Sequence, residues 1–362
     1  MATNNIKEVD SNMLKTTLDG EVGIIFHDIR KAPFKIYGLY KPETESVFKR
    51  MPDEVGLNVN KGVARHYICT AGGRVRFSTD SRHIVIRTVM PYEARYDHMP
   101  RTNVCGFDLY EDTSVGSRFV GTFRPGTADI SHGYEAVINL PDSCVRSLTI
   151  NFPSYNPVSS LEIGLDADST LGDGARYRTD KPIVYYGSSI TQGGCASRPG
   201  NTYESIISRR LGLDYINLGF SGNALAEESI VEYMSGLDML VFVSDYDHNA
   251  RSVEYLADTH CRMYKMIREK HPDIPYIMLS RPDFQKEREQ SILRRNVIID
   301  TYRYALSQGD KNVYYIDGES LFRGPDEDSC TVDGTHPTDL GFAKMAEAIE
   351  CELRRALRNA QF

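Results

Sequence analysis

Two adjacent serines follow a short apolar run near the middle of the chain, in the stretch IVYYGSSITQGG from Ile183 to Gly194. If the apolar run is a buried strand, the serines lie at its carboxyl end, where open parallel sheets gather reactive groups. A serine hydroxyl is inert by itself and becomes a nucleophile only beside a base that a third group orients. A lone Gly-Ser-Ser segment is better explained as a turn, so catalysis by Ser188 or Ser189 requires partners elsewhere.

A carboxylate and an imidazole lie three residues apart near the C-terminus, in the stretch CTVDGTHPTDLGF. On a loop, this spacing lets the Asp333 carboxylate reach one nitrogen of His336 while the other nitrogen faces outward. The pair could supply the base and the orienting group that a serine nucleophile needs. Each residue alone has a simpler interpretation, because Asp333 could be a loop residue, His336 a packed side chain, and Thr338 or Asp339 a helix cap. The combination with the two serines favours catalysis.

The bulk composition excludes several classes of protein. The chain has 362 residues, which is comfortable for two domains, and its 41% hydrophobic and 25% charged residues are ordinary for a globular protein. A net charge of -8 argues against a nucleic-acid or anionic-membrane partner, because either would favour a basic face. No apolar run approaches the ~18 residues of a membrane span.

The cysteines and the first residues indicate a cytoplasmic protein. The seven cysteines are dispersed without a CxxC motif or ligand-like spacing, so reduced thiols are expected rather than a disulfide framework. Residues 1–20 are polar and lack an apolar core, which predicts that there is no signal peptide.

The first half of the chain has the pattern of a β protein. Residues 73–90 form two alternating runs around a polar Asp80-Ser81 turn, which predicts a hairpin. Shorter alternating runs follow at residues 147–152 and 161–165. Many short strands separated by turns predict a β-sandwich or jelly roll.

The second half alternates short apolar strands with helical patterns. This alternation predicts a parallel sheet with helices on both faces, that is, an α/β domain. We therefore expect an N-terminal β-sandwich at residues 1–175 and a three-layer α/β/α domain at residues 176–362. The expected strands are 183–186, 215–218, 239–243, 276–279 and 313–316, and the expected helices are 203–211, 227–234, 253–270, 287–306 and 340–357.

Three motifs in the second half resemble the SGNH (GDSL-type) hydrolase superfamily. Its first block is matched by Gly187-Ser188-Ser189-Ile190-Thr191, its second by Asn217-Leu218-Gly219-Phe220-Ser221-Gly222 and its last by Asp333-Gly334-Thr335-His336-Pro337. The blocks occur in the family's order and cover about 180 residues. The resemblance implies that Ser189 is the nucleophile, His336 the base and Asp333 the orienting group.

The resemblance also implies an oxyanion hole, with one uncertain member. The N–H groups of Ser189 and Gly222 would be two of its donors. The family's third block, Gly-x-Asn-Asp, is replaced here by Ser244-Asp245-Tyr246-Asp247-His248-Asn249. We assign the missing asparagine to Asn249, because an ionised Asp247 would repel the developing charge. The alternative is that Asn249 is a turn residue before a helix.

The first half contains Gly106-Phe107-Asp108-Leu109-Tyr110, which resembles the GxDLY segment of a β-rich domain that precedes some SGNH esterase domains. Carbohydrate esterases of related build imply O-acylated sugars as substrates. Candidate substrate-binding residues are Asp108, Tyr110 and Asp247, although for Asp108 we favour a structural role in a turn.

The expected activity is hydrolysis of a short, acetyl-type ester on a small molecule or oligosaccharide, with no metal and no cofactor. Asp245, Asp247 and His248 could imitate a metal cluster, but their spacing matches no established motif. Two alternatives remain open: an acyltransferase with the same triad, and a carbohydrate-binding protein with a lapsed site. The absence of Trp argues mildly against sugars, although 22 tyrosines could replace it as stacking surfaces. The sequence leaves the oligomeric state open, a homo-oligomer included.

Overall fold

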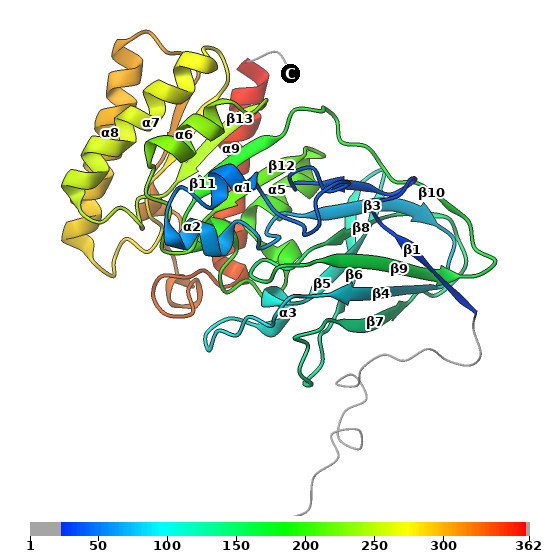
Figure 1. Cartoon of the computed structure of the whole chain (residues 1–362). Helices are drawn as coiled ribbons and strands as arrows, with labels where there is room; N and C mark the ends of the chain where they lie inside the picture. The colour runs from blue at the N-terminus through cyan, green and yellow to red at the C-terminus, as the bar shows by residue number, and fades with distance from the viewer. Residues whose placement is uncertain (1–22, 360–362) are drawn as a thin grey trace, which may run out of the picture.

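The computed structural model describes residues 23–359, and a strand-rich part lies beside a sheet that helices cover (Figure 1). The segment 1–20, for which no signal peptide is expected, lies outside the described residues. Strand pairing changes from antiparallel to parallel between β10, which ends at Asp173, and β11, which begins at Ile183. This confirms the predicted architecture of an N-terminal sandwich followed by an α/β unit.

The N-terminal part is an antiparallel sandwich of two sheets. One sheet has the strand order β1-β9-β4-β7, and the other has the order β10-β3-β8-β5-β6 with β2 paired to β3. Apolar side chains of both sheets, such as Phe77 and Ile86, share one buried core. The strands are β1 (Ile24–Asp28), β2 (Lys35–Tyr37), β3 (Arg74–Thr79), β4 (His83–Val89), β5 (Phe107–Thr113), β6 (Gly116–Phe123), β7 (Tyr134–Asn139), β8 (Arg146–Asn151), β9 (Ser160–Asp166) and β10 (Leu171–Asp173).

The hairpin predicted around Asp80-Ser81 is wrong. β3 pairs with β2, β8 and β10, whereas β4 pairs with β7 and β9 in the facing sheet. The Ser81 hydroxyl donates to the His83 carbonyl at 2.7 Å, inside the segment that crosses between the sheets. An alternating apolar pattern is equally compatible with both arrangements, because each strand turns its apolar side toward the shared core.

The C-terminal part is a five-stranded parallel sheet with the order β12-β11-β13-β14-β15. Alternate residues of β11 enter different cores: Val184 and Tyr186 face one helical layer, Ile183 and Tyr185 the other. A strand buried on both faces is apolar throughout, as parallel sheets require. The strands are β11 (Ile183–Gly187), β12 (Tyr215–Gly219), β13 (Val241–Asp245), β14 (Tyr276–Leu279) and β15 (Val313–Ile316).

Helices cover both faces of this sheet and make the three-layer arrangement. Side chains of α6, α7 and α8 share one core, and those of α5 and α9 share the other. Within residues 23–359, no helix is long and apolar enough to cross a membrane. The helices are α4 (Ser189–Gln192), α5 (Tyr203–Leu211), α6 (Glu228–Ser235), α7 (Val253–Lys270), α8 (Arg288–Ser307) and α9 (Asp339–Asn359), with 3-10 turns at Pro199–Asn201, Gly318–Ser320 and Glu327–Ser329.

A segment of the first half packs into the second half. Met51, Val63 and Tyr67 belong to the same buried core as β11 and α6, and α1 and α2 lie against the parallel sheet in Figure 1. The Arg50 guanidinium donates to the carbonyl oxygens of Asn217 and Gly219 at the end of β12. The first half of the sequence therefore contributes residues both to the core of the sandwich and to a core beside the parallel sheet. The short helices in the described part of this half are α1 (Asp53–Gly56), α2 (Lys61–His66) and α3 (Arg101–Val104).

Candidate active site

The turn after β11 requires glycine at position 187. A Cβ there would lie 2.0 Å from Thr191 Oγ1 and 2.4 Å from the carbonyl oxygen of Asp245, which is too close for any other residue. The chain therefore passes from β11 directly into the short helix α4, whose first residue is Ser189. The strand and the helix together fix the direction of the two serine side chains.

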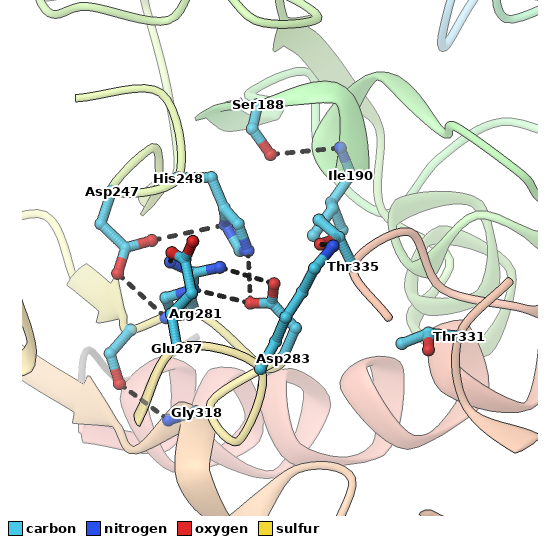
Figure 2. Close-up of polar contacts among 12 residues, drawn as sticks. Ser188, Ile190, Asp247, His248, Arg281, Asp283, Glu287, Gly318, Thr331 and Thr335 are labelled. Atoms are coloured by element: carbon cyan, nitrogen blue, oxygen red, sulfur yellow. Dashed lines mark hydrogen bonds and ion pairs between the residues drawn. The ribbon is translucent and has the colours of Figure 1, made fainter. Parts of the chain in front are cut away.

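The two serines have different partners. Ser188 Oγ is fully buried and accepts the N–H of Ile190 at 3.2 Å, so it caps α4 (Figure 2). Ser189 Oγ instead lies 2.9 Å from Nε2 of His336. Of the two hydroxyls, only that of Ser189 is bonded to a group that could act as a base.

Asp333 holds His336 from the other side. Its Oδ2 lies 2.7 Å from Nδ1 of the imidazole, and its Oδ1 accepts the N–H groups of Thr335 at 3.0 Å and His336 at 2.8 Å. Partial burial raises the pKa of this carboxyl, but the hydrogen bonds to His336 and Thr335 outweigh that effect and lower the pKa to about 2. Asp333 is therefore ionised at neutral pH, as a partner for an imidazolium must be.

The three groups expected in the oxyanion hole each have a hydrogen-bond donor without an acceptor among the described residues. The N–H groups of Ser189 and Gly222 donate to no residue of the described part of the chain. Gly222 has a φ of 70°, and nothing lies within 4 Å of the position where a Cβ would stand. Asn249 Oδ1 accepts the N–H of Ala224 at 3.1 Å, which leaves its Nδ2 as the unused end of the amide. The place of Asn249 in the oxyanion hole stays a prediction, with which this hydrogen bond is compatible.

Hydrogen bonds and ion pairs with neighbouring segments fix the loop that carries Asn249. Arg294 donates to the carbonyl oxygens of Asp247 at 2.6 Å and Ala250 at 2.9 Å. His248 Nε2 lies 2.7 Å from Asp283 Oδ1, and the same carboxylate is bound by Arg281 through two hydrogen bonds (Figure 2). Burial lowers the pKa of His248, but the Asp283 carboxylate outweighs it, so the pKa lies above its ordinary value. A network of opposite charges therefore anchors the loop.

Asp247 is part of this network rather than of an open surface. Only 1% of it is exposed, and its Oδ2 accepts the N–H of Arg281 at 3.1 Å. The side chain offers a substrate no contact in this arrangement, contrary to the expected substrate-binding role. Its neighbour Asp245 is also buried, and this burial raises the pKa of Asp245 to about 8.

Asp108 and Tyr110 also lie inside the protein, where they join the two parts of the chain. Asp108 has no exposed surface, and its carboxylate accepts from Asn151 at 2.7 Å, from Gly200 N–H at 2.8 Å and from Arg198 at 3.0 Å. Tyr110 is 3% exposed and its hydroxyl also meets Arg198. Asp108 thus takes the structural role that the sequence favoured, and neither side chain is bonded to the triad.

Sequence reasoning missed the residues of the first half that touch the site. The Tyr155 hydroxyl donates to the carbonyl oxygen of Ser189 at 3.1 Å, and the His98 ring lies 5.3 Å from the His336 ring between centroids. Gln192, in the stretch around Ser189, accepts the N–H of Ser221 at 3.0 Å beside the free Gly222 donor. Only Gln192 had a signal in sequence, through its place beside the motif.

Among residues 23–359, two groups of side chains place potential metal ligands within 4.8 Å of one another. One comprises Asp245, Asp247 and His248, and the other comprises His98, Cys195 and His336. In the first group, Nε2 of His248 is already bonded to Asp283 Oδ1 at 2.7 Å. The second group includes the triad histidine itself.

Comparisons with known proteins agree with this geometry. Residues 180–354 match the GDSL-like lipase/acylhydrolase family, and residues 24–171 match the GxDLY family, the N-terminus of SGNH-hydrolase-type esterases. A search of curated proteins gives no match.

Several solved structures share the whole fold. A Bacteroides ovatus protein assigned to the GDSL-like lipases is 30% identical, covers 93% of this chain and 98% of its own, and superposes with a TM-score of 0.83. A salicylyl-acyltransferase from a tetracycline biosynthetic pathway is 18% identical, with 92% and 97% covered and a TM-score of 0.71. A Clostridium thermocellum family two carbohydrate esterase, solved with cellohexaose, is 14% identical, with 92% and 99% covered and a TM-score of 0.59. The chain therefore belongs to the GDSL-like lipase/acylhydrolase (SGNH) family of carboxylic-ester hydrolases and carries a GxDLY domain in its first half.

Proposed function

We propose that the protein hydrolyses short acyl esters, acetyl groups on a carbohydrate in particular, through Ser189, His336 and Asp333. The observation that carries this proposal is the pair of hydrogen bonds that joins Ser189 Oγ to His336 at 2.9 Å and His336 to Asp333 at 2.7 Å. A hydroxyl, an imidazole and a carboxylate in this order form the arrangement that activates a serine nucleophile.

The reaction has two steps. Ser189 Oγ attacks the acyl carbon while His336 takes its proton, and Asp333 stabilises the imidazolium that forms. The N–H groups of Ser189 and Gly222 and the amide of Asn249 bind the tetrahedral oxyanion. His336 then protonates the departing alcohol, and a water molecule releases the acid from the acyl-enzyme by the same route.

The proposal of a carbohydrate acetate as substrate is based on the activities of proteins with a similar fold. The family two carbohydrate esterase that shares this fold was solved with cellohexaose, and another neighbour is an acetyl xylan esterase. Sugar hydroxyls and rings need polar and aromatic groups beside the nucleophile. Here the loop that carries Tyr96 and His98 comes from the sandwich and lies against the triad side.

The test compares two serine variants on a small aryl acetate and on an acetylated oligosaccharide. Ser189→Ala should lower kcat/KM by about 10³-fold or more, because the nucleophile is lost while the oxyanion donors remain. Ser188→Ala is the matched control: it removes a cap worth ~1 kcal/mol of stability but no catalytic group, so most activity should remain. The reverse order of effects would move the nucleophile to Ser188.

An acyltransferase is the second candidate, because the salicylyl-acyltransferase superposes with a higher TM-score than the carbohydrate esterases. Both activities use one acyl-enzyme, which either water or an alcohol attacks. Measuring free acid and transferred ester with and without added alcohols separates them. Hydrolysis predicts that free acid accounts for the acyl group released even when sugar alcohols are present.

A further inference from the structure

Three potential metal ligands from distant parts of the chain meet beside the proposed catalytic base. His98 belongs to a loop of the first half, Cys195 follows α4 and His336 precedes α9, and one ligand atom of each lies within 4.8 Å of the others. We propose that this trio binds Zn²⁺ and that the bound ion reversibly inactivates the enzyme by occupying His336.

The chemistry of the trio favours zinc. Imidazole nitrogen and thiolate sulfur are the ligands that Zn²⁺ prefers, in a tetrahedral site with bonds of about 2.0–2.3 Å. Each imidazole already has its Nδ1 on a carboxylate: His336 on Asp333 at 2.7 Å and His98 on Asp97 at 3.1 Å. This leaves Nε2 of both rings for a metal, in the carboxylate–histidine–metal arrangement that is common around zinc.

The backbone at Cys195 is a second, independent observation. Its φ is 71°, a left-handed conformation that is costly for a residue with a side chain, by on the order of 1 kcal/mol. Gly193, two residues earlier, has a φ of 97°, and its carbonyl accepts a hydrogen bond from Asn103 at 2.7 Å. The fold thus maintains a strained backbone that keeps the Cys195 thiol beside the His98 segment, where Sγ lies 3.4 Å from the His98 carbonyl oxygen. Strain of this kind concentrates at functional sites.

Binding requires a small rearrangement and one proton. Ligand atoms around a tetrahedral zinc lie roughly 3.4 Å apart, so the trio must close up, and the His98 side chain, 33% exposed, can rotate to do so. The Cys195 thiol releases its proton to solvent as the Zn–S bond forms. A bond from Zn²⁺ to Nε2 of His336 replaces the hydrogen bond to Ser189 Oγ, and water takes the fourth position. The base can then no longer accept the serine proton.

Direct binding is tested first, on the full-length protein and without any substrate. Co²⁺ replaces Zn²⁺ and gives a near-ultraviolet charge-transfer band only when a thiolate is a ligand. We expect this band to saturate at one equivalent and to be absent from Cys195→Ser. Cys351→Ser, which removes an exposed thiol on α9, is the matched control and should keep the band. A band that survives in Cys195→Ser, or no band at all, would overturn the proposal.

Inhibition is tested next on an aryl ester, each variant being compared with its own metal-free rate. Zn²⁺ should inhibit the native enzyme, and a chelator should restore the rate. Cys195→Ser and His98→Gln should each raise the inhibitory concentration by at least about ten-fold, as the loss of metal-site groups typically does. Equal inhibition of native enzyme and His98→Gln would contradict the site even if Cys195→Ser did not fold. The binding test stands whether or not the natural substrate is a sugar ester.

Discussion

Ser188 and Ser189 are adjacent, yet their hydroxyl groups meet different partners. The first lies within reach of the Ile190 N–H and closes the start of α4, whereas the second lies one position further along and faces His336. Ser188 is the N-cap residue with an extended backbone, whereas Ser189 is the first residue of α4, so the change of backbone conformation between them points the two side chains in different directions. Side-chain direction, rather than residue type, distinguishes the two roles.

Asn249 gives a prediction about transition-state binding. Asn249→Ala should lower kcat by about 10²-fold with little change in KM, because the oxyanion forms only during the reaction. Asn249→Asp is the control: it can still accept the Ala224 N–H but cannot donate to an oxyanion. If Asn249→Asp were active and Asn249→Ala inactive, the residue would be a structural cap and the donor would have to be sought elsewhere.

Asp245 gives a prediction about pH. Burial raises its pKa to about 8 in the folded protein, against ~3.9 in an unfolded chain. Between these values the folded state holds a proton that the unfolded state has lost, so this stabilising contribution, present below pH 4, is lost as the pH rises toward 8. Asp245→Asn does not titrate. The free energy of unfolding of the native protein, measured with urea relative to that of Asp245→Asn, should therefore fall between pH 5 and pH 8, and a pH-independent difference would contradict the assignment.

Among individual residues, the sequence predicted those that belong to a recognisable motif. Ser189, Asp333 and His336 were selected by motif spacing, and the structure brings them within hydrogen-bond distance. Their catalytic roles stay predictions until the variants are measured. Tyr155 and His98 could not be found in the same way, because their contacts depend on how the sandwich docks and no local pattern encodes that.

Among the elements, the short strand β12 and the turn after it are held by a cation from the sandwich half. Arg50 donates to the carbonyl oxygens of Asn217 at 3.0 Å, Gly219 at 2.7 Å and His66 at 2.7 Å. Burial lowers its pKa to about 10, so it stays charged at neutral pH. The turn that follows β12 leads to Gly222, and its geometry therefore depends on a residue far away in sequence.

Replacing Arg50 should be costly. Arg50→Met would leave three buried carbonyl oxygens without their donor, which should lower the free energy of unfolding by roughly 2–4 kcal/mol. Urea unfolding measures the loss, with Arg303→Met as the control, since 74% of that side chain is exposed on α8. A loss no larger than that of the control would show that water or a local shift satisfies the carbonyls.

Helices and strands with a clear periodic pattern of apolar residues were predicted with accurate bounds, whereas segments with a weaker pattern were not. The helix at residues 253–270 and the strand at 313–316 have the predicted bounds, because a long amphipathic segment and a short, mostly buried apolar run leave few alternatives. The strand expected at 239–243 lies two residues later, at Val241–Asp245, where a polar end is buried by the site network. The hairpin at residues 73–90 failed because alternation reports burial of one face and not the identity of the paired strand.

In the whole molecule, the two halves of the sequence share more contacts than a division at residue 175 suggests. Residues of the first half contribute to the core beside the parallel sheet, and side chains of the sandwich hold the carbonyl oxygens of Ser189 and Gly193. Residues of both halves thus contact the Ser189 segment, in agreement with the general preference of ligand sites for domain interfaces.

A fragment of residues 176–362 should therefore fail to fold alone. It would expose the core surface that Met51, Val63 and Tyr67 cover, and lose the hydrogen bonds of Arg50 and Tyr155. Circular dichroism, gel filtration and urea unfolding of the fragment measure this, with the full chain as reference. A monomeric fragment that unfolds cooperatively and hydrolyses an aryl acetate would contradict the prediction and leave the sandwich with specificity alone.

The packing of Met51, Val63 and Tyr67 against the parallel sheet also bears on how the protein is made. Synthesis on the ribosome delivers these residues long before the strands that cover them, since β13 begins only at Val241. The nascent chain must therefore carry an uncovered apolar segment through much of translation, when chaperones and proteases can reach it. We expect ribosome-bound chains arrested near residue 230 to be cleaved within residues 51–67 by added protease, and chains arrested after release of the full sheet to be protected there. Protection at the earlier arrest point would mean that the sandwich shelters this segment by itself.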